Sequence, residues 1–146
     1  MRHVRSQRLT LCLILLAVVG MAATPSALAH PPAPVKPNGQ PIVGKLHSLL
    51  HQAKVPLVRG RLEIRRKGCP GRPVLLGCVW TPAPRRLYLS PRAPDLRTVL
   101  YHELGHTFDL RVLNQRERAK FKRIIGIRRR GWFSGALPPA EWFADA

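Results

Sequence analysis

The chain has 146 residues, with 25 Lys and Arg against 7 Asp and Glu, and a formal net charge of +18. This length is typical of one domain and argues against two, since domains usually span about 100 to 200 residues. Hydrophobic residues form 45% of the chain, which excludes a wholly disordered protein, because disordered chains lack the apolar surface that offsets the entropy of ordering.

Residues 1–29 have the three parts of a secretory signal peptide. A positive start with Arg2, Arg5 and Arg8 precedes an apolar stretch, and an Ala-Leu-Ala cleavage pattern ends at Ala29. The apolar stretch has about 15 residues, fewer than the roughly 20 that a membrane-spanning helix needs, which disfavours retention as an anchor. We therefore expect a secreted or extracytoplasmic protein with no stable membrane span after cleavage.

Two cysteines, Cys69 and Cys78, remain once the signal peptide is removed. Exported proteins fold in oxidising compartments, so we expect a disulfide between them. On the chain-entropy model, closing a loop of this size stabilises the fold by roughly 2.5 to 3 kcal/mol. A structural zinc site is the alternative, although it usually needs four ligands in paired clusters.

The segment after the signal peptide, residues 30–40, is rich in proline and predicts an extended, unpacked linker. The folded domain is expected over residues 41–146. Apolar residues at three- and four-residue steps predict a helix over residues 42–53, and alternation of polar and apolar residues predicts a strand over residues 61–65.

The rest of the domain is expected to contain two more strands and three helices. The first of these helices starts after Asp95, which has the side chain of a helix N-cap. The last helix follows two prolines, which favour the first helical turn. The predicted elements cover residues 74–80, 86–89, 96–110, 115–125 and 141–146. The fold class predicted is α+β, with a short antiparallel or mixed sheet.

A short motif in the first of these helices, His102-Glu103-Leu104-Gly105-His106, matches the pattern H-E-x-x-H. Residues four apart on a helix lie nearly above one another, so both histidines can bind one Zn²⁺ at about 2.0 to 2.1 Å. Glu103 would then act as the general base toward a zinc-activated water. The alternative is a pair of surface or core histidines with no metal.

A catalytic zinc site of this kind needs a third protein ligand and one open position. Metzincins place Gly and then His or Asp after the second histidine, but this chain has Asp109 and Val112 there, which excludes that class. Glu141, 35 positions after His106, is the candidate, and the small Ala144 would let its helix pack closely. The alternative is that Glu141 only stabilises a helix N-terminus, by about 0.3 to 1 kcal/mol.

Two aspartates are candidates for supporting the ligands. Asp109 lies on the same helix face as both histidines and could accept a hydrogen bond from one of them, which fixes the histidine tautomer. A solvent-exposed carboxylate is the alternative. Asp145, four residues after Glu141, is a candidate for the same supporting role.

The run from His102 to Asp109, followed by Glu141-Trp142-Phe143-Ala144-Asp145, resembles the gluzincin metallopeptidases. The pattern is most similar to the catalytic domain of anthrax-lethal-factor-like zinc proteases, and the resemblance covers residues 98–146. It implies a zincin-like domain that binds Zn²⁺ through His102, His106 and Glu141 and hydrolyses peptide or protein substrates with Glu103 as the base.

The same resemblance implies an edge strand that holds the substrate in extended form by β-augmentation. We expect that strand at Leu87, Tyr88 and Leu89. The resembling proteases also place a tyrosine shortly before the third ligand to stabilise the oxyanion, whereas this chain has Gly-Trp-Phe-Ser at residues 131–134. Loss of one such donor typically costs about 10² to 10³ in rate, so we expect weak activity. The chain stops one residue after Asp145, which suggests truncation at the C-terminus.

A dense basic stretch lies on and after the helix over residues 115–125. Such a stretch could bind an anionic cell-envelope polymer, which makes a non-catalytic, zinc-stabilised binding module the alternative function. It could also be an ordinary solvated face. Nucleic acid is a disfavoured partner because no aromatic residues interleave with the cations at regular spacing. The basic residues are Arg116, Arg118, Lys120, Lys122, Arg123, Arg128, Arg129 and Arg130.

Overall fold

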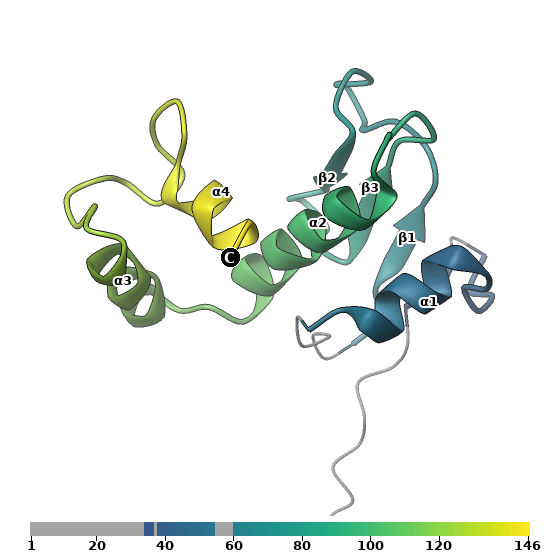
Figure 1. The fold of residues 1–146 in the computed structure, drawn as a ribbon, viewed down its shortest axis with the longest axis horizontal. Helices are drawn as coiled ribbons and strands as arrows, with labels where there is room; N and C mark the ends of the chain where they lie inside the picture. The colour runs from purple at the N-terminus through teal and green to yellow at the C-terminus, as the bar shows by residue number, and fades with distance from the viewer. Residues whose placement is uncertain (1–33, 37, 55–59) are drawn as a thin grey trace, which may run out of the picture.

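The computed structural model describes residues 34–36, 38–54 and 60–146, so the predicted signal peptide lies outside the described residues. None of the helices in these ranges is long and apolar enough to cross a membrane. The described chain is a mixed α+β domain, which confirms the predicted class (Figure 1). Its elements are α1 (Lys45–Gln52), β1 (Glu63–Arg65), β2 (Gly77–Val79), β3 (Arg86–Leu89), α2 (Leu96–Arg111), α3 (Gln115–Ile124) and α4 (Pro139–Ala144).

Helix α2 is the longest element, and it contacts β2, β3 and α4. Asp95 caps it as predicted, because its Oδ1 accepts hydrogen bonds from the backbone N–H groups of Arg97 at 2.9 Å and Thr98 at 3.3 Å. The Thr98 side chain also donates to this carboxylate, and these hydrogen bonds hold the pKa of Asp95 below its ordinary value. Figure 1 shows α2 running from the sheet to α4, so one rigid element joins both halves of the domain.

The sheet has the strand order β1-β3-β2, with β3 parallel to β1 and antiparallel to β2. The prediction that Leu87, Tyr88 and Leu89 form the substrate-binding edge is therefore wrong, because both edges of β3 are already paired. Leu87 and Leu89 are fully buried and Tyr88 nearly so. Consecutive apolar residues are typical of a strand covered on both faces. The edge strand beside α2 is β2.

Part of the predicted linker belongs to the fold. The backbone N–H of Val35 donates to the carbonyl oxygen of Leu62 at 2.8 Å, and the N–H of Ile64 donates to the carbonyl oxygen of Val35 at 2.9 Å. Val35 thus pairs beside β1, and Pro34 is buried. The expectation of an unpacked linker is therefore wrong for Pro34 and Val35, because both backbone groups of Val35 are hydrogen-bonded beside β1. Residues 30–33 and 37 of the predicted linker lie outside the described residues.

The apolar core lies between α1, the sheet and one side of α2. Leu87 and Leu89 of β3 meet Leu100 and Leu104 of α2, and α1 contributes its buried leucines, Leu49 and Leu50. The Tyr101 hydroxyl donates to the carbonyl oxygen of Leu49 at 3.0 Å. These contacts seat α2 on the sheet.

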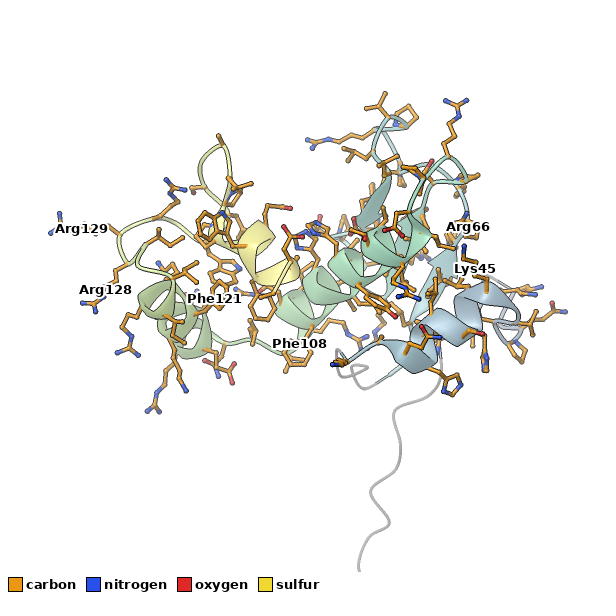
Figure 2. All side chains as sticks on the ribbon, in the orientation of Figure 1. Lys45, Arg66, Phe108, Phe121, Arg128 and Arg129 are labelled. Atoms are coloured by element: carbon orange, nitrogen blue, oxygen red, sulfur yellow. A yellow bond between two sulfur atoms is a disulfide. The ribbon has the colours of Figure 1, made fainter. Side chains whose placement is uncertain are left out.

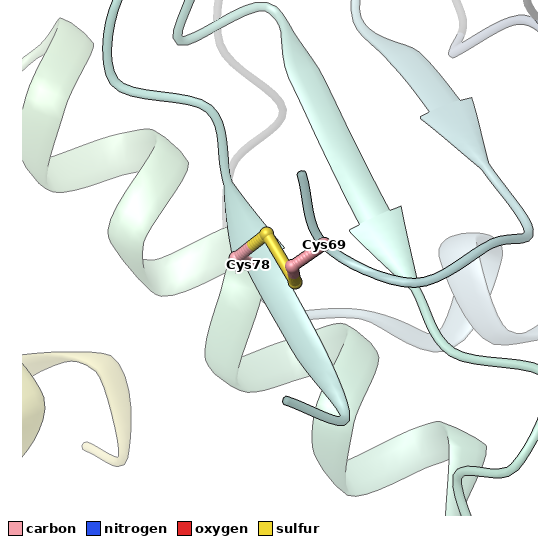
Figure 3. Close-up of a disulfide and its surroundings, with 2 residues drawn as sticks. All are labelled: Cys69 and Cys78. Carbon is pink, nitrogen blue, oxygen red and sulfur yellow. A yellow bond between two sulfur atoms is a disulfide. The ribbon is translucent and has the colours of Figure 1, made fainter. Parts of the chain in front are cut away.

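The predicted disulfide between Cys69 and Cys78 is present, which excludes the structural zinc alternative for these residues. Their Cα atoms are 6.0 Å apart. Figure 3 shows that it joins the loop before β2 to β2 itself. The covalent link therefore restrains the edge strand.

A second apolar cluster packs α4 and α3 against the C-terminal half of α2. It consists of four aromatic side chains, Phe108, Phe121, Trp132 and Phe143, with ring centroids 5.3 to 6.4 Å apart. Figure 2 labels Phe108 and Phe121 on facing elements. Because α4 has only six residues and isolated short helices are marginal in water, we infer that this packing is what keeps it helical.

Asp109 lies at the base of this cluster, with a fully buried side chain. Its Oδ1 accepts from Arg118 Nε at 2.8 Å and its Oδ2 accepts from Trp132 Nε1 at 2.9 Å. We expected Asp109 either to accept a hydrogen bond from a ligand histidine or to be exposed to solvent. Both predictions are wrong, because its carboxylate is buried and bound by Arg118 and Trp132. Asp109 instead joins α2 to α3 and to the loop that leads into α4.

The substitution Asp109→Asn tests this role. An amide cannot accept two charge-assisted hydrogen bonds, and Arg118 would keep a partly buried charge without its carboxylate. We expect the free energy of unfolding to fall by about 3 to 5 kcal/mol, as for other broken buried ion pairs. Urea denaturation measures it. Arg116→Met, which removes an exposed cation from the same helix, should change stability by no more than about 0.5 kcal/mol. Equal effects of the two substitutions would contradict the assignment.

Candidate metal centre

Three side chains from α2 and α4 converge on one point. His102 and His106, one turn apart on α2, have their Nε2 atoms 3.0 Å from each other. Glu141 on α4 places its Oε2 3.2 Å from Nε2 of His102 and 3.4 Å from Nε2 of His106. Within the described ranges, this is the one group of three or more His, Cys, Asp or Glu residues with metal-binding geometry.

The triangle formed by these three atoms fits a small tetrahedral metal ion. Donors bound at about 2.0 to 2.1 Å in a tetrahedron lie roughly 3.3 to 3.4 Å apart, and the three observed separations are close to that value. The donor types also matter. Two imidazoles with one carboxylate suit zinc and similar transition metals, whereas Mg²⁺ and Ca²⁺ prefer oxygen donors throughout.

A close approach of α4 to α2 brings Glu141 to the histidines. Gly105 lies between His102 and His106 in the sequence. A Cβ atom at this position would be 2.7 Å from the Cα atom of Ala144 and 2.9 Å from the carbonyl oxygen of Ala144. A side chain on Gly105 would therefore meet backbone atoms of α4, and α4 would have to shift to accommodate it. Ala144 is small and buried, as expected from the sequence.

Asp145 supports His102 from the outer side of the ring. The Nδ1 atom of His102 is 2.7 Å from Oδ1 of Asp145, so the ring donates there and leaves the Nε2 lone pair facing His106 and Glu141. A carboxylate in this position fixes the tautomer that a metal ligand requires. The sequence suggested a hydrogen bond to a ligand histidine for both Asp109 and Asp145. In the structure Asp145 makes this hydrogen bond.

Glu103 lies beside the triangle, but its carboxylate is turned toward β2. The side chain is buried, the backbone N–H of Val79 donates to the carboxylate, and Oε2 has no hydrogen-bond partner among the described residues. Burial raises the pKa of Glu103 to about 7, against the opposing effect of nearby His102. An unpartnered buried carboxylate oxygen next to three metal-ligand atoms is the arrangement expected of a proton acceptor.

Burial also lowers the pKa of His106, which favours the neutral imidazole. Only the neutral ring has a lone pair available for a metal ion.

Gly77 makes room for Glu103. A Cβ atom at this position would lie 2.7 Å from Oε1 of Glu103 and 2.7 Å from Cγ1 of Val99. The sequence reasoning did not single out Gly77 or Val79 as functional residues. A glycine inside a predicted strand is the signal that could have identified Gly77, because it often marks a close approach of another group.

A cleft of about 490 Å³ opens over the triangle, with β2 on one wall and the start of α4 on the other. Leu75 and Phe133 contribute apolar surface to it, and Arg72 and Thr81 contribute polar groups. Neither Tyr88 nor Tyr101 lines this cleft, so neither takes the place of the tyrosine that the resembling proteases have near the third ligand. Tyr88 is buried in β3, and the Tyr101 hydroxyl donates to the backbone of α1.

The chain matches no protein-family model, no curated protein and no solved structure in comparisons with each. The resemblance to gluzincins therefore rests on the two short motifs, and the chemistry of the site must be argued from its own geometry.

Gly105→Ala tests the close approach of the two helices. Alanine should favour the helical state of α2 by about 1 kcal/mol, yet its methyl group would push α4 and Glu141 away from the histidines. We expect weaker zinc binding, measured by competition with a chromogenic chelator, while circular dichroism shows an intact helix content. Unchanged zinc affinity in this variant would show that the α2–α4 contact does not set the position of Glu141.

Proposed function

We propose that the protein is a zinc-dependent peptidase of the gluzincin type, with His102, His106 and Glu141 as ligands. The observation that carries this proposal is the triangle of ligand atoms with the buried, unpartnered Glu103 carboxylate beside it. Zinc bound there would supply a Lewis acid that polarises a substrate carbonyl and makes water acidic enough to react near neutral pH.

The remaining chemistry belongs to side chains of this chain. Glu103 Oε2 accepts the proton of the attacking water and passes it to the leaving amine as the peptide bond breaks. Glu103 is held for this task by the Val79 N–H, by its close packing against the backbone at Gly77 and by its rigid helix. Asp145 keeps His102 in the tautomer that presents Nε2.

The edge of β2 offers the binding surface for an extended substrate. Ser90 N–H donates to the carbonyl oxygen of Leu76 at 2.8 Å, and Trp80 N–H donates to that of Arg86 at 2.9 Å. In an antiparallel pair, the backbone N–H and C=O groups of successive residues point alternately toward the partner strand and away from it. The backbone groups of Leu76, Cys78 and Trp80 therefore point toward β3, whereas those of Gly77 and Val79 point toward the open edge. A peptide adding to this edge would lie across the mouth of the cleft and hydrogen-bond to Gly77.

Glu103→Gln separates the two roles in this proposal. The amide preserves shape but cannot take a proton, so the variant should bind zinc as tightly as the wild type and lose about 10² to 10⁴ of its hydrolysis rate. Zinc content is measured by plasma emission spectrometry, and hydrolysis with a quenched fluorescent peptide library. A variant that cleaves at the wild-type rate would refute the role of Glu103.

Gly77→Ala is the matched variant for the wall of the cleft. The atoms nearest to its methyl group would belong to Glu103 and Val99, so the substitution would displace Glu103 first and not a ligand. Retained zinc with lost hydrolysis is therefore expected again.

A second candidate function, binding of an anionic cell-envelope polymer, is favoured by one observation. Arg116, Lys120 and Arg123 line one exposed face of α3, and none of them pairs with a carboxylate in the described part of the chain. Figure 2 shows Arg128 and Arg129 projecting from the same end of the molecule, opposite Lys45 and Arg66. Glu117 lines the same face of α3, but its single carboxylate is outnumbered by the three cations.

Adhesion to purified anionic wall polymer tests this candidate. Changing Arg116, Lys120 and Arg123 to Gln should weaken adhesion, and rising salt should weaken the wild type, because exposed charges are screened beyond about 8 to 10 Å at physiological ionic strength. Changing Lys45, Lys54 and Arg66 to Gln removes the same charge from exposed positions outside α3 and serves as the control. Equal losses in both triple variants would indicate net charge rather than a binding face.

A further inference from the structure

A second pair of histidines lies far from the candidate metal centre in sequence, on α1. The Nε2 atoms of His47 and His51 are 3.0 Å apart, and their ring centroids are 4.4 Å apart. Both side chains are exposed. This is the same one-turn separation, with the same distance between the Nε2 atoms, as for His102 and His106.

Two imidazole nitrogens this close have few ways to coexist. They can share one proton in a hydrogen bond, or they can present two lone pairs to one cation. Neutral imidazole binds late first-row metals well, and affinity rises along the series to Cu²⁺. The exposed face of a helix leaves the other coordination positions to water.

The surroundings of the pair decide what it can bind. It borders a cavity of about 240 Å³ whose other walls are apolar, formed by Pro34, Val35, Pro41, Ile42 and Leu50. Within the described residues no carboxylate joins the pair, so the site has two nitrogen donors and no charged oxygen donor. Such a donor set disfavours Mg²⁺ and Ca²⁺ and favours zinc or copper.

The helix that carries the pair would gain from a bound ion. Helix α1 has eight residues, its N-cap residue Gly44 provides no side-chain hydrogen bond, and its first turn has no acidic residue. A cation held by residues four apart links successive turns, which favours the helical state of a segment that is otherwise marginal.

We propose that His47 and His51 form a second metal-binding site, specific for a late first-row divalent cation such as Zn²⁺ or Cu²⁺, that stabilises α1. The site does not depend on the proposed peptidase function, because it shares no residue with the candidate metal centre.

Zinc stoichiometry of the full chain, prepared without a histidine tag, tests the proposal. Isothermal titration of the wild type should show two equivalents, and His51→Gln should show one. The double variant His51→Gln/Gln52→His keeps the composition but moves the second imidazole five positions from His47, out of reach of a shared ion. It should also bind one equivalent. His106→Ala should bind one equivalent, held by His47 and His51.

The outcomes separate this site from the candidate metal centre. A single equivalent that persists in His51→Gln and disappears in His106→Ala would overturn the second site and leave the peptidase proposal intact. A single equivalent that disappears in His51→Gln and persists in His106→Ala would support the second site and count against the peptidase proposal. Two equivalents in the position-swapped double variant would also overturn the proposal. Zinc beyond the first equivalent should raise the melting temperature of the wild type but not of His51→Gln.

Discussion

The candidate metal centre depends on one steric constraint, the contact of α4 with the backbone of α2 at Gly105 and Ala144. The two histidines are one turn apart on the same helix, so the formation of α2 alone brings them together. The third ligand comes from a six-residue helix 35 positions later, and it reaches them only because no side-chain atom separates the two backbones at this crossing. The packing of two small residues thus determines whether two or three candidate ligand side chains converge on one point.

A helix this short needs external support, and Asp109 provides it through a relay of contacts. Asp109 binds the indole of Trp132, the carbonyl oxygen of Trp132 accepts from the N–H of Ala140 at 3.1 Å, and Ala140 precedes Glu141. The Phe143 ring packs against Phe108 and Phe121 on the other side. Buried polar groups of this kind are costly unless fully satisfied, and here both carboxylate oxygens are. Asp109 therefore acts on the site without touching it.

Local patterns in the sequence predicted the helices and strands well, because capping and periodicity depend on near neighbours. The Asp95 cap, the range of β3 and the disulfide are all confirmed. Features that depend on residues far apart in the sequence were harder to predict. The edge strand at Leu87, Tyr88 and Leu89 was implied by the resemblance to gluzincins, and neither two short motifs nor periodicity reveals that β3 is the central strand. The spacing of Asp109 placed it on the histidine face of α2 but could not show that Arg118 and Trp132 would occupy it. Gly77 was missed because the group that needs its empty space lies on another element.

The disulfide gives the cleft a dependence on its chemical surroundings. Cys78 is the middle residue of β2, between the two residues that face the open edge, and Cys69 anchors it from the preceding loop. Strand β2 has only three residues and a single partner strand, so the crosslink is a large part of what restrains it. Reduction would loosen the wall that holds Glu103 while leaving the histidines on their helix. The redox potential of the compartment would then control the shape of the cleft separately from the supply of metal.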